Sequence, residues 1–228
     1  MIFVGDIHGQ FETYYYLIGN KNLADGTTVI QVGDHGLFSA YNFSEKYKLY
    51  RHYRDYRKVI SPNIDIRFVR GNHDNPEICR KDPKYLGDFS YSKNLDMMFI
   101  SGAWSIDWMY RTSQVDWWTD EELCDDDFEN VIAMMHKYKP RWIVSHDCPA
   151  KLYKQFFGYT PQQPTRTGHY LNRILEECPP TSGWIFGHHH HEVDCRVNGV
   201  RFVCCDINEV KDILIPGQEN GIGDLVYE

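Results

Sequence analysis

The apolar residues of this chain fall into short runs, and each run is followed by polar residues or by glycine. A run of this kind has the length of a buried β-strand and is too short for a helix. The predicted strands lie at residues 1–5, 28–32, 64–69, 97–101, 142–145 and 184–186. Residues 193–197 and 200–204 flank Asn198-Gly199, a dipeptide that favours tight turns, so we also expect a β-hairpin.

Segments with helical spacing of apolar residues lie between the strands. We expect helices over residues 11–20, 45–58, 125–138 and 170–177. The third helix is the most regular, with an apolar face made of Phe128, Val131, Ile132, Met135 and Tyr138.

Capping and loop signals refine these boundaries. Ser44 is a candidate cap for the helix at 45–58, and Thr119 with Glu122 forms a capping-box pattern ahead of the third helix. Residues 155–168 contain two prolines and two glycines, so we expect a loop there.

The order of the elements indicates the fold class. Strands alternate with helices in the first half of the chain, whereas hairpin character dominates the end. This order is typical of mixed α/β architectures, in which helices cover the faces of a sheet. A chain of 228 residues with 42% apolar and 25% charged residues suits a single domain with a full core. We therefore expect one domain spanning residues 1–228.

Composition also limits where the protein works and what it binds. No apolar run is long enough to cross a membrane, and the opening strand pattern leaves no room for a signal peptide. Seven cysteines without regular spacing favour reduced thiols and hence a cytoplasmic protein. The net charge of −8 argues against a broad surface for long nucleic acids, although bound cations would make a local site positive. Composition does not decide the oligomeric state.

Polar residues collect at the ends of the predicted strands. They are Asp6, His8, Asp34, Asn72-His73-Asp74, His146-Asp147 and His188–His191. Loops at the carboxyl ends of strands converge in layered α/β folds, so we expect these residues to share one site. Each residue alone has an ordinary structural role as its alternative, such as a helix cap or a turn. Their combination at five strand ends favours a site.

The side chains at these positions suit metal ions. Asp and Asn oxygens and His nitrogens are ligands for manganese, iron and zinc. Cysteine is absent from these strand ends except for Cys148, which argues against a structural zinc site. A carboxylate such as Asp34 can bridge two cations, and two cations about 3.5–4 Å apart suit in-line displacement at phosphorus.

The stretch from Trp184 to Asp194 contains four successive histidines, His188–His191. The run is internal, which excludes a purification tag and leaves a solvated loop or a metal-binding loop. In an extended segment, residues i and i+2 face the same way. We therefore expect His188 and His190 to point to one side, and His189 and His191 to the other.

The motifs, taken in order, resemble those of the calcineurin-like metallophosphoesterase superfamily. They are Asp6-x-His8, Gly33-Asp34, Gly71-Asn72-His73-Asp74, Ser145-His146 and Gly187-His188-x-His190. The segments 101–107 and 145–149, with Arg111 and Trp117-Trp118, also resemble a group of poorly characterised microbial and phage members. The resemblance implies a four-layer αββα fold, in which two mixed sheets are flanked by helices around a dinuclear metal centre.

The resemblance also assigns roles to residues. Two divalent ions would be bound, with Mn²⁺ as the first candidate and iron, Zn²⁺ or Ni²⁺ as alternatives. One ion would be held by Asp6, His8, Asp34 and His190, and the other by Asp34, Asn72, His146 and His188. His73 would protonate the leaving oxygen or steady the phosphoryl group. The cations would disfavour its charged form, so His73 would need an acidic partner to act as an acid.

One motif departs from the pattern of the protein phosphatases in this superfamily. They carry Gly-Asp-x-x-Asp-Arg, whereas this chain has Gly-Asp-His-Gly-Leu-Phe at residues 33–38 and lacks the second Asp and the Arg. Protein phosphatase activity of the standard kind is therefore disfavoured. Asp74 is then a candidate catalytic support for His73. His35 is a candidate contact to the substrate phosphate, unless it only packs beside the site.

Two arginines are further candidates for binding substrate. The guanidinium groups of Arg111 and Arg173 match the oxygens of a phosphate, although either could be an ordinary ion-paired arginine. Trp117 and Trp118 could wall a pocket that stacks a base, but packing in the core is the commoner role of tryptophan.

These observations together predict a metal-dependent phosphoric ester hydrolase, either a phosphatase or a phosphodiesterase. It would act through attack of a metal-bridged hydroxide on a small phosphorylated substrate, with nucleotides among the candidates. One alternative is a binding module that keeps the fold without catalysis. Another is a nuclease or nucleotide phosphodiesterase. The acidic balance weighs against long polymers as substrates, but not against a dinucleotide or a cyclic nucleotide.

Overall fold

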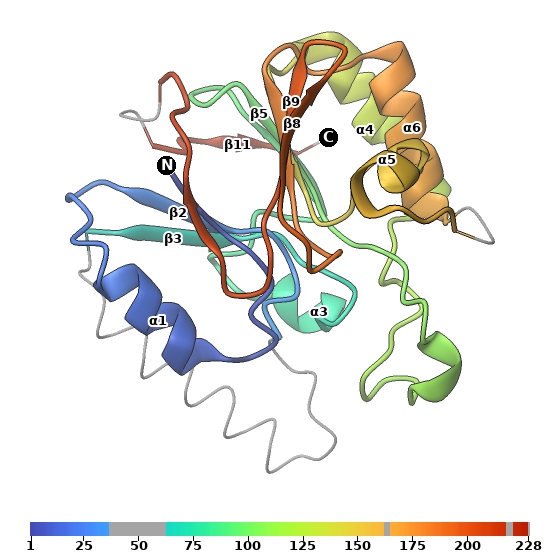
Figure 1. The fold of residues 1–228 in the computed structure, drawn as a ribbon, viewed down its shortest axis with the longest axis horizontal. Helices are drawn as coiled ribbons and strands as arrows, with labels where there is room; N and C mark the ends of the chain where they lie inside the picture. The colour runs from blue at the N-terminus through green and yellow to red at the C-terminus, as the bar shows by residue number, and fades with distance from the viewer. Residues whose placement is uncertain (37–62, 162–164, 218–220, 228) are drawn as a thin grey trace.

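The computed structural model describes residues 1–36, 63–161, 165–217 and 221–227. Within them, two mixed β-sheets face each other, and helices cover their outer faces (Figure 1). The predicted α/β fold class is therefore confirmed. The helix expected at residues 45–58, with its cap at Ser44, lies outside the described residues.

The smaller sheet has the strand order β10-β1-β2-β3. Its strands are β1 (Ile2–Val4), β2 (Thr28–Gln31), β3 (Asp65–Phe68) and β10 (Val210–Asp212). Strands β1, β2 and β3 are parallel, and β10 pairs antiparallel with β1. The carboxyl ends of the three parallel strands therefore meet at one edge.

The larger sheet has the strand order β11-β4-β5-β6-β7-β9-β8. Its strands are β4 (Phe89–Ser92), β5 (Met97–Ile100), β6 (Trp142–Ser145), β7 (Gly183–Phe186), β8 (Val193–Val197), β9 (Val200–Cys204) and β11 (Leu225–Val226). The central strands β5, β6, β7 and β9 are parallel, and the outer pairings are antiparallel.

The helices form the outer layers. They are α1 (Phe11–Gly19), α3 (Pro76–Cys79), α4 (Asp125–Tyr138), α5 (Tyr153–Phe157) and α6 (Arg166–Glu177), with 3₁₀ turns η1 (Trp108–Tyr110) and η2 (Ala150–Leu152). Helix α1 lies beside the small sheet, whereas α4, α5 and α6 lie beside the large one (Figure 1).

Successive side chains of a strand point to opposite faces of the sheet, so they belong to different core clusters. In β7, Ile185 belongs to the cluster between the two sheets, while Trp184 and Phe186 pack with the residues of α4 and α6. In β5, Phe99 likewise points between the sheets and Met98 toward the helices. Strands that are buried on both faces carry continuous apolar runs, which is why the sequence shows runs rather than alternation here.

Two expected boundaries are wrong. Helix α4 is capped by Cys124, whose Sγ accepts the backbone N–H of Asp127, and not by Thr119. Glu122, the other half of the expected capping box, instead accepts the backbone N–H of Thr167 and so joins α6 to this loop. The expected loop at 155–168 contains the end of α5 and the start of α6, because Thr165 caps α6 through the N–H of Gly168.

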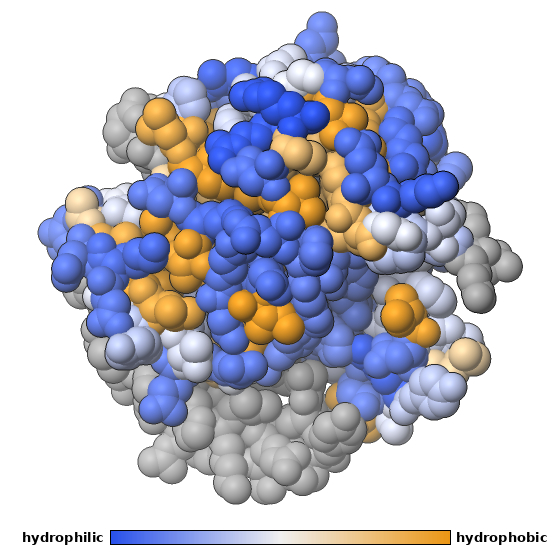
Figure 2. All heavy atoms as spheres, in the orientation of Figure 1, coloured by the Kyte–Doolittle hydropathy of each residue, from blue (hydrophilic) through white to orange (hydrophobic). Residues whose placement is uncertain are grey.

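The surface is mostly hydrophilic on the face shown in Figure 2, with hydrophobic residues scattered between polar ones. The loop that carries η1 exposes Ile106, Trp108, Met109 and Tyr110. Among the described helices, none has the length and apolarity needed to cross a membrane.

Candidate metal centre

The candidate site lies where the loops after β1, β2 and β3 meet the loops after β6 and β7. All seven predicted metal ligands follow these strands: Asp6, His8, Asp34, Asn72, His146, His188 and His190. The site therefore takes ligand candidates from both sheets.

The ligand candidates form two groups that share one carboxylate. The exposed subsite consists of Asp6, His8, Asp34 and His190, and the buried subsite of Asp34, Asn72, His146 and His188. Within each group, the donor atoms of the Asp and His residues lie within 4.8 Å of one another. Asn72 belongs to the buried subsite because its Oδ1 is 3.2 Å from Nε2 of His146. Asp34 is thus placed to bridge two cations.

Glycines before the ligands allow the strand ends to approach. A Cβ atom on Gly71 would collide with Oδ1 of Asp34 and Nε2 of His146, and one on Gly187 would collide with Oδ1 of Asp6. These positions therefore require glycine for close packing around the site.

The expectation of an extended four-histidine segment is wrong. His188 and His190 have φ angles of 66° and 48°, and His8 and Asp34 also have positive φ, at 44° and 52°. Left-handed backbone is costly for residues other than glycine and occurs where surrounding structure fixes it, often at functional sites. His188 and His190 thus reach the two subsites through tight turns rather than through strand alternation.

The buried subsite is anchored by hydrogen bonds. The carbonyl oxygen of Val32 lies 2.9 Å from Nδ1 of His146, so Nδ1–H donates to it and Nε2 is left as the ligand atom. The side-chain amide of Asn72 donates to Oγ of Ser105 at 3.0 Å, which turns its Oδ1 toward His146. Oγ of Ser105 in turn donates to Glu121 at 2.6 Å.

Ser105 and Glu121 are functional candidates that the sequence did not reveal. Both are buried, and the backbone N–H of Ser105 also donates to Glu121. Burial raises the pKa of Glu121 to about 7, partly offset by these hydrogen bonds. No motif signalled the pair, because Glu121 is 16 residues from Ser105 in sequence and contacts it only in the folded chain.

The exposed subsite has the open donor atoms that a cation requires. Oδ2 of Asp6 is buried and has no hydrogen-bond donor, yet it lies 3.0 Å from Nε2 of His190. Nε2 of His190 is also 3.0 Å from Nε2 of His8. These three atoms carry lone pairs and lie close together, and shared protons do not satisfy all of them. Such a group of atoms suits a metal ion. The residues present therefore suit the dinuclear centre that the resemblance implies.

Electrostatics prepare the buried subsite differently at its two histidines. Burial lowers the pKa of His188 to about 3, so its imidazole is neutral and free to coordinate. Burial also disfavours the charged form of His146, but the carboxylates of Asp34 and Asp6 outweigh it and raise the pKa of His146 to about 10. Without metal, a proton occupies the place of the cation at His146, so metal binding must release it.

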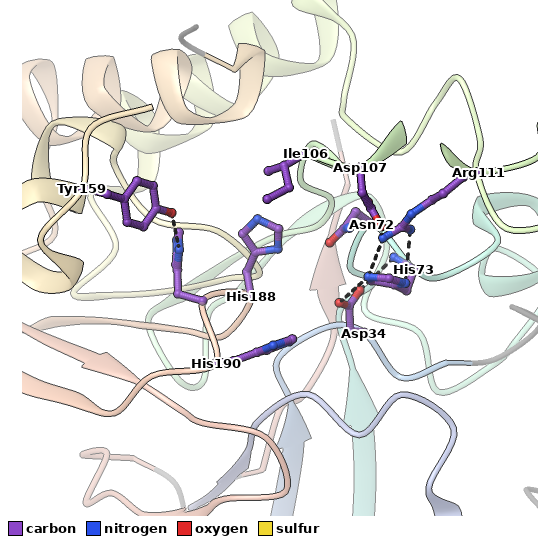
Figure 3. A pocket seen from close by; sticks show the side chains of 10 residues that line it. Asp34, Asn72, His73, Ile106, Asp107, Arg111, Tyr159, His188 and His190 are labelled. Atoms are coloured by element: carbon purple, nitrogen blue, oxygen red, sulfur yellow. Dashed lines mark hydrogen bonds and ion pairs between the residues drawn. The ribbon is translucent and has the colours of Figure 1, made fainter. Parts of the chain in front are cut away.

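Arg111 and His73 lie together at the mouth of the site. The guanidinium nitrogens of Arg111 are 3.1 Å and 2.8 Å from the two ring nitrogens of His73, and Asp107 holds Arg111 at 2.7 Å. Nε2 of His73 is 3.8 Å from Asp34. Burial lowers the pKa of His73; Asp34 opposes this shift, and Arg111 adds to it. Figure 3 shows these side chains on one side of the pocket.

Asp74 does not have the arrangement expected of a support for His73. Its carboxylate accepts the backbone N–H groups of Gly71 at 2.8 Å, Gly36 at 2.7 Å and His35 at 3.1 Å. It thereby ties the loop after β3 to the loop after β2. Burial and the charge of Asp34 raise the pKa of Asp74 to about 7 against these hydrogen bonds. In the described structure, Asp74 therefore anchors the two loops to each other.

Neither of the candidate substrate-binding residues His35 and Arg173 is among the residues that line the pocket. The ring of His35 is buried and stacks on Phe68 at 4.7 Å, with Phe11 beside it, in the layer under α1. Arg173 forms ion pairs with Glu129 of α4 and with Glu177. A buried aromatic environment and paired carboxylates account for these two residues.

The two neighbouring tryptophans do not line the pocket. Trp118 is buried in the core, and the ring of Trp117 lies 5.8 Å from that of Trp108. Core and loop packing, rather than stacking of a base, is their role in the described structure.

His189, which was expected to point to the side opposite His188 and His190, forms part of a buried polar network. Its Nε2 lies 2.9 Å from Oδ1 of Asp147, and the hydroxyl of Tyr153 donates to the same carboxylate at 2.6 Å. Burial raises the pKa of Asp147, but these hydrogen bonds and the histidine charges outweigh it and lower the pKa to about 2. The network joins the loop of His146 to the loop of His188 and His190.

The two subsites open into a pocket of about 350 Å³. Its walls are Asp34, Asn72, His73, Ile106, Asp107, Arg111, Tyr159, His188, His189 and His190. A volume of this size suits a small ligand. Among the ligand candidates, Asp34, Asn72, His188 and His190 face this space, and Arg111 is the predicted substrate-binding residue that joins them.

Comparison with protein families decides the family of the chain. The model of the calcineurin-like phosphoesterases matches residues 1–209. The chain belongs to the calcineurin-like phosphoesterases. This family characteristically uses a dinuclear metal centre, which agrees with the two groups of donors that share Asp34. No curated protein matches the chain in sequence.

Solved structures share the calcineurin-like phosphoesterase fold at low sequence identity. A dimetal phosphatase from Danio rerio is 11% identical, with a TM-score of 0.57, and the match covers 92% of this chain and 88% of that one. A putative 5′-nucleotidase from Staphylococcus aureus is 13% identical, with a TM-score of 0.54, over 92% of this chain and 49% of that one. GAP50, the anchor in the inner membrane complex of Plasmodium, is 11% identical, with a TM-score of 0.52. The match covers 90% of this chain and 71% of that one.

Proposed function

We propose that this calcineurin-like phosphoesterase hydrolyses a small phosphoric ester with the help of two divalent metal ions. The observation that carries the proposal is the position of Asp34. This carboxylate belongs to both groups of metal donors and also faces the pocket that contains His73 and Arg111. Asp6, His8, Asp34 and His190 would hold one ion, and Asp34, Asn72, His146 and His188 the other.

Bound in this way, the two ions would lower the pKa of a water molecule and neutralise the oxygens of the phosphoryl group. Mn²⁺ is the first candidate and iron, Zn²⁺ and Ni²⁺ the alternatives, because the donors are oxygens and imidazole nitrogens.

Arg111 and His73 would hold the phosphoryl group. Asp107 neutralises part of the charge of Arg111 and fixes its guanidinium group in the pocket. The lowered pKa of His73 favours its neutral form, which can donate one hydrogen bond to a phosphoryl oxygen. Arg111 would then supply the positive charge that protein phosphatases of this family obtain from a different position.

The pocket and the surface support a small substrate. The cavity of about 350 Å³ holds a nucleotide-sized molecule, and the net charge of −8 disfavours long nucleic acids. The resemblance of the fold to a putative 5′-nucleotidase makes nucleotides the first class to assay. All seven cysteines lie in the described part of the chain and are free thiols, which supports the proposed cytoplasmic location.

Metal analysis and turnover together test the proposal. The protein is produced in defined medium and its metals are measured. It is then assayed with p-nitrophenyl phosphate, bis-p-nitrophenyl phosphate and a single-stranded oligonucleotide, each with Mn²⁺, Fe²⁺, Zn²⁺ or Ni²⁺. We expect about two ions per chain and turnover of the monoester or the diester. Absence of metal and of turnover under every condition would refute the proposal.

The alternative is a binding module without catalysis, and GAP50 shows that this fold also occurs in a protein described as an anchor. That alternative predicts metal binding without turnover of any ester. His73→Ala separates the two: in an enzyme it lowers the rate while the metal content stays the same. A variant that loses metal would contradict the role given to His73.

A further inference from the structure

The pocket has two chemically different sides. Figure 3 shows His73 and Arg111 on one side and Tyr159 on the other, with the metal-ligand candidates His188 and His190 between them. Ile106 forms a further wall, and this residue is 77% exposed. The proposed function uses the charged side and the ligands, and it leaves Tyr159 and Ile106 without a role.

Tyr159 is held in place although the residue is 46% exposed. Its hydroxyl is 3.1 Å from Nδ1 of His189, and Nε2 of the same ring is 2.9 Å from the buried carboxylate of Asp147. The rings of Tyr153 and Phe157 lie 5.5 Å and 6.1 Å from that of Tyr159. A hydroxyl fixed at one end and neighbouring rings at the other leave part of an aromatic surface available at the pocket wall.

Ile106 is fixed from both sides. Ser105 before it is buried and hydrogen-bonded to Glu121, and Asp107 after it is ion-paired with Arg111. The exposed apolar side chain therefore stays at the pocket wall instead of folding into the core. Contact of this side chain with a ligand would remove apolar area from water and add to binding.

We propose that Tyr159 and Ile106 form a subsite for a flat aromatic group in the alcohol portion of the substrate, which makes a nucleoside phosphate the preferred class of ester. This inference rests on the proposed hydrolysis of a small phosphoric ester. Arg111 and His73 hold the phosphoryl end, and the aromatic end stacks on Tyr159. An aromatic face favours offset stacking with a base, and such stacking accepts every base because each has a π-face.

A matched pair of substrates isolates the aromatic group. Adenosine 5′-monophosphate and ribose 5-phosphate carry the same phosphoryl group on the same primary oxygen and differ in the base. We expect the Mn²⁺-loaded protein to prefer the nucleotide by about tenfold in kcat/KM, because stacking of one base on an aromatic side chain has that order of effect. A change at the metal centre alters kcat/KM for both compounds equally, so it does not affect the ratio of the two values.

Variants locate the preference. Tyr159→Leu removes the aromatic face, and we expect the ratio of the two kcat/KM values to fall toward one. Tyr159→Phe keeps the face but loses the contact with His189, so it should retain most of the preference. Tyr16→Leu is the matched control, because Tyr16 is also exposed but lies on α1 outside the pocket walls. It should leave the ratio as in the parent protein.

The outcomes separate this proposal from the function on which it rests. If neither compound is hydrolysed, calorimetric titration of the Mn²⁺-loaded protein with each compound gives the same comparison as a ratio of dissociation constants. Turnover or binding without preference for the nucleotide overturns the aromatic subsite and leaves the phosphoesterase intact. A preference that survives Tyr159→Leu also overturns it, since the base would then be recognised elsewhere.

Discussion

The two subsites of the candidate metal centre share Asp34 but differ in their exposure to solvent. In the buried subsite, the side chain of His146 is fully buried and its Nδ1–H is held by the carbonyl of Val32. In the exposed subsite, the side chains of His8 and His190 are 25% and 42% exposed. A buried, pre-oriented set of donors favours slow exchange of its ion, whereas exposed histidines leave an ion open to water and to competing ligands.

The two subsites should therefore retain their ions differently. We expect the buried subsite to keep its ion through purification and the exposed subsite to depend on the metal in the buffer.

Asp34→Asn should have the largest effect because it removes the carboxylate that both subsites share. We expect both ions to be lost or weakened, and activity to fall by about a thousandfold or more, since the metals supply several kcal/mol of transition-state stabilisation. Metal content and kcat are measured together. Asp126→Asn, on the exposed side of α4, is the control and should change neither. Full metal content in Asp34→Asn would contradict the shared-ligand assignment.

His146→Ala and His190→Ala compare the two subsites directly. Each removes one ligand, so the loss of metal affinity should exceed the roughly 10–100-fold that removal of an outer hydrogen-bond partner costs. The difference lies in rescue. Added Mn²⁺ should restore much of the activity of His190→Ala, whose site is open, and little of the activity of His146→Ala. If a titration with Mn²⁺ restored the activity of both variants equally, the two subsites would not differ in accessibility as their burial indicates.

Ser105→Ala sharpens the comparison because it affects only the buried subsite. It removes the hydroxyl that holds Asn72 and leaves Glu121 with one donor fewer. We expect metal affinity or activity to fall by about 10–100-fold. Ser113→Ala, an exposed serine of the same loop, is the matched control and should behave as the parent protein. An unchanged metal affinity in Ser105→Ala would remove Ser105 from the supports of the centre.

Asp147→Asn tests the network that joins the ligand loops in the absence of metal. The pKa of Asp147 is lowered in the folded protein from its ordinary value of 3.8 to about 2. Its stabilisation is therefore present above about pH 4 and is lost as the pH falls toward 2. The shift corresponds to about 2 kcal/mol. We expect urea unfolding of the metal-free parent protein to show this loss, and Asp147→Asn to show a flatter pH dependence. A slope that is unchanged in the variant would contradict the assignment.

His191→Ala should have the smallest effect. His191 is exposed, and its ring lies 5.9 Å from that of Phe157. Surface substitutions of this kind usually change stability by less than about 0.5 kcal/mol, so metal content and kcat should stay within about twofold. His189→Ala provides the contrast, because it removes the imidazole that lies 2.9 Å from the carboxylate of Asp147. Equal effects of the two substitutions on thermal stability would show that the network contributes nothing.

The sequence predicted the parts of the fold that local patterns determine. The hairpin of β8 and β9 and the bounds of α4 agree with the residue ranges expected from Asn198-Gly199 and from the apolar face of the helix. The short strands β4, β10 and β11 were missed, because their apolar residues do not form a distinct run. Pairing with a neighbouring strand, which no local pattern records, makes them strands.

In the site, too, features that depend on a local pattern were predictable and features that depend on tertiary contacts were not. Strand-end position and residue type indicated the ligand candidates, and the structure brings them together in two groups. The orientation of side chains was less predictable. His35 has a position beside Asp34 in sequence but faces the layer under α1, and Asp74 next to His73 turns toward backbone amides. Neighbours in sequence at a tight turn point in different directions, so motif membership alone does not place them.

The supports of the site lie beyond sequence reasoning for a related reason. Glu121 contacts Ser105 only because the loop between them folds back, and His189 meets Asp147 across two strand ends. Such contacts depend on tertiary structure, whereas a ligand candidate at a strand end can be recognised from one segment.

The distribution of ligand candidates along the chain has a consequence for synthesis in the cell. Asp6 and His8 precede His188 and His190 in the chain by 182 residues. Domains emerge from the ribosome N-terminus first, so a nascent chain exposes Asp6, His8 and Asp34 long before either subsite can be completed. Neither group of ligand candidates is complete until β7 has emerged and the two sheets have met. We therefore expect metal to bind only to chains in which the two sheets have met.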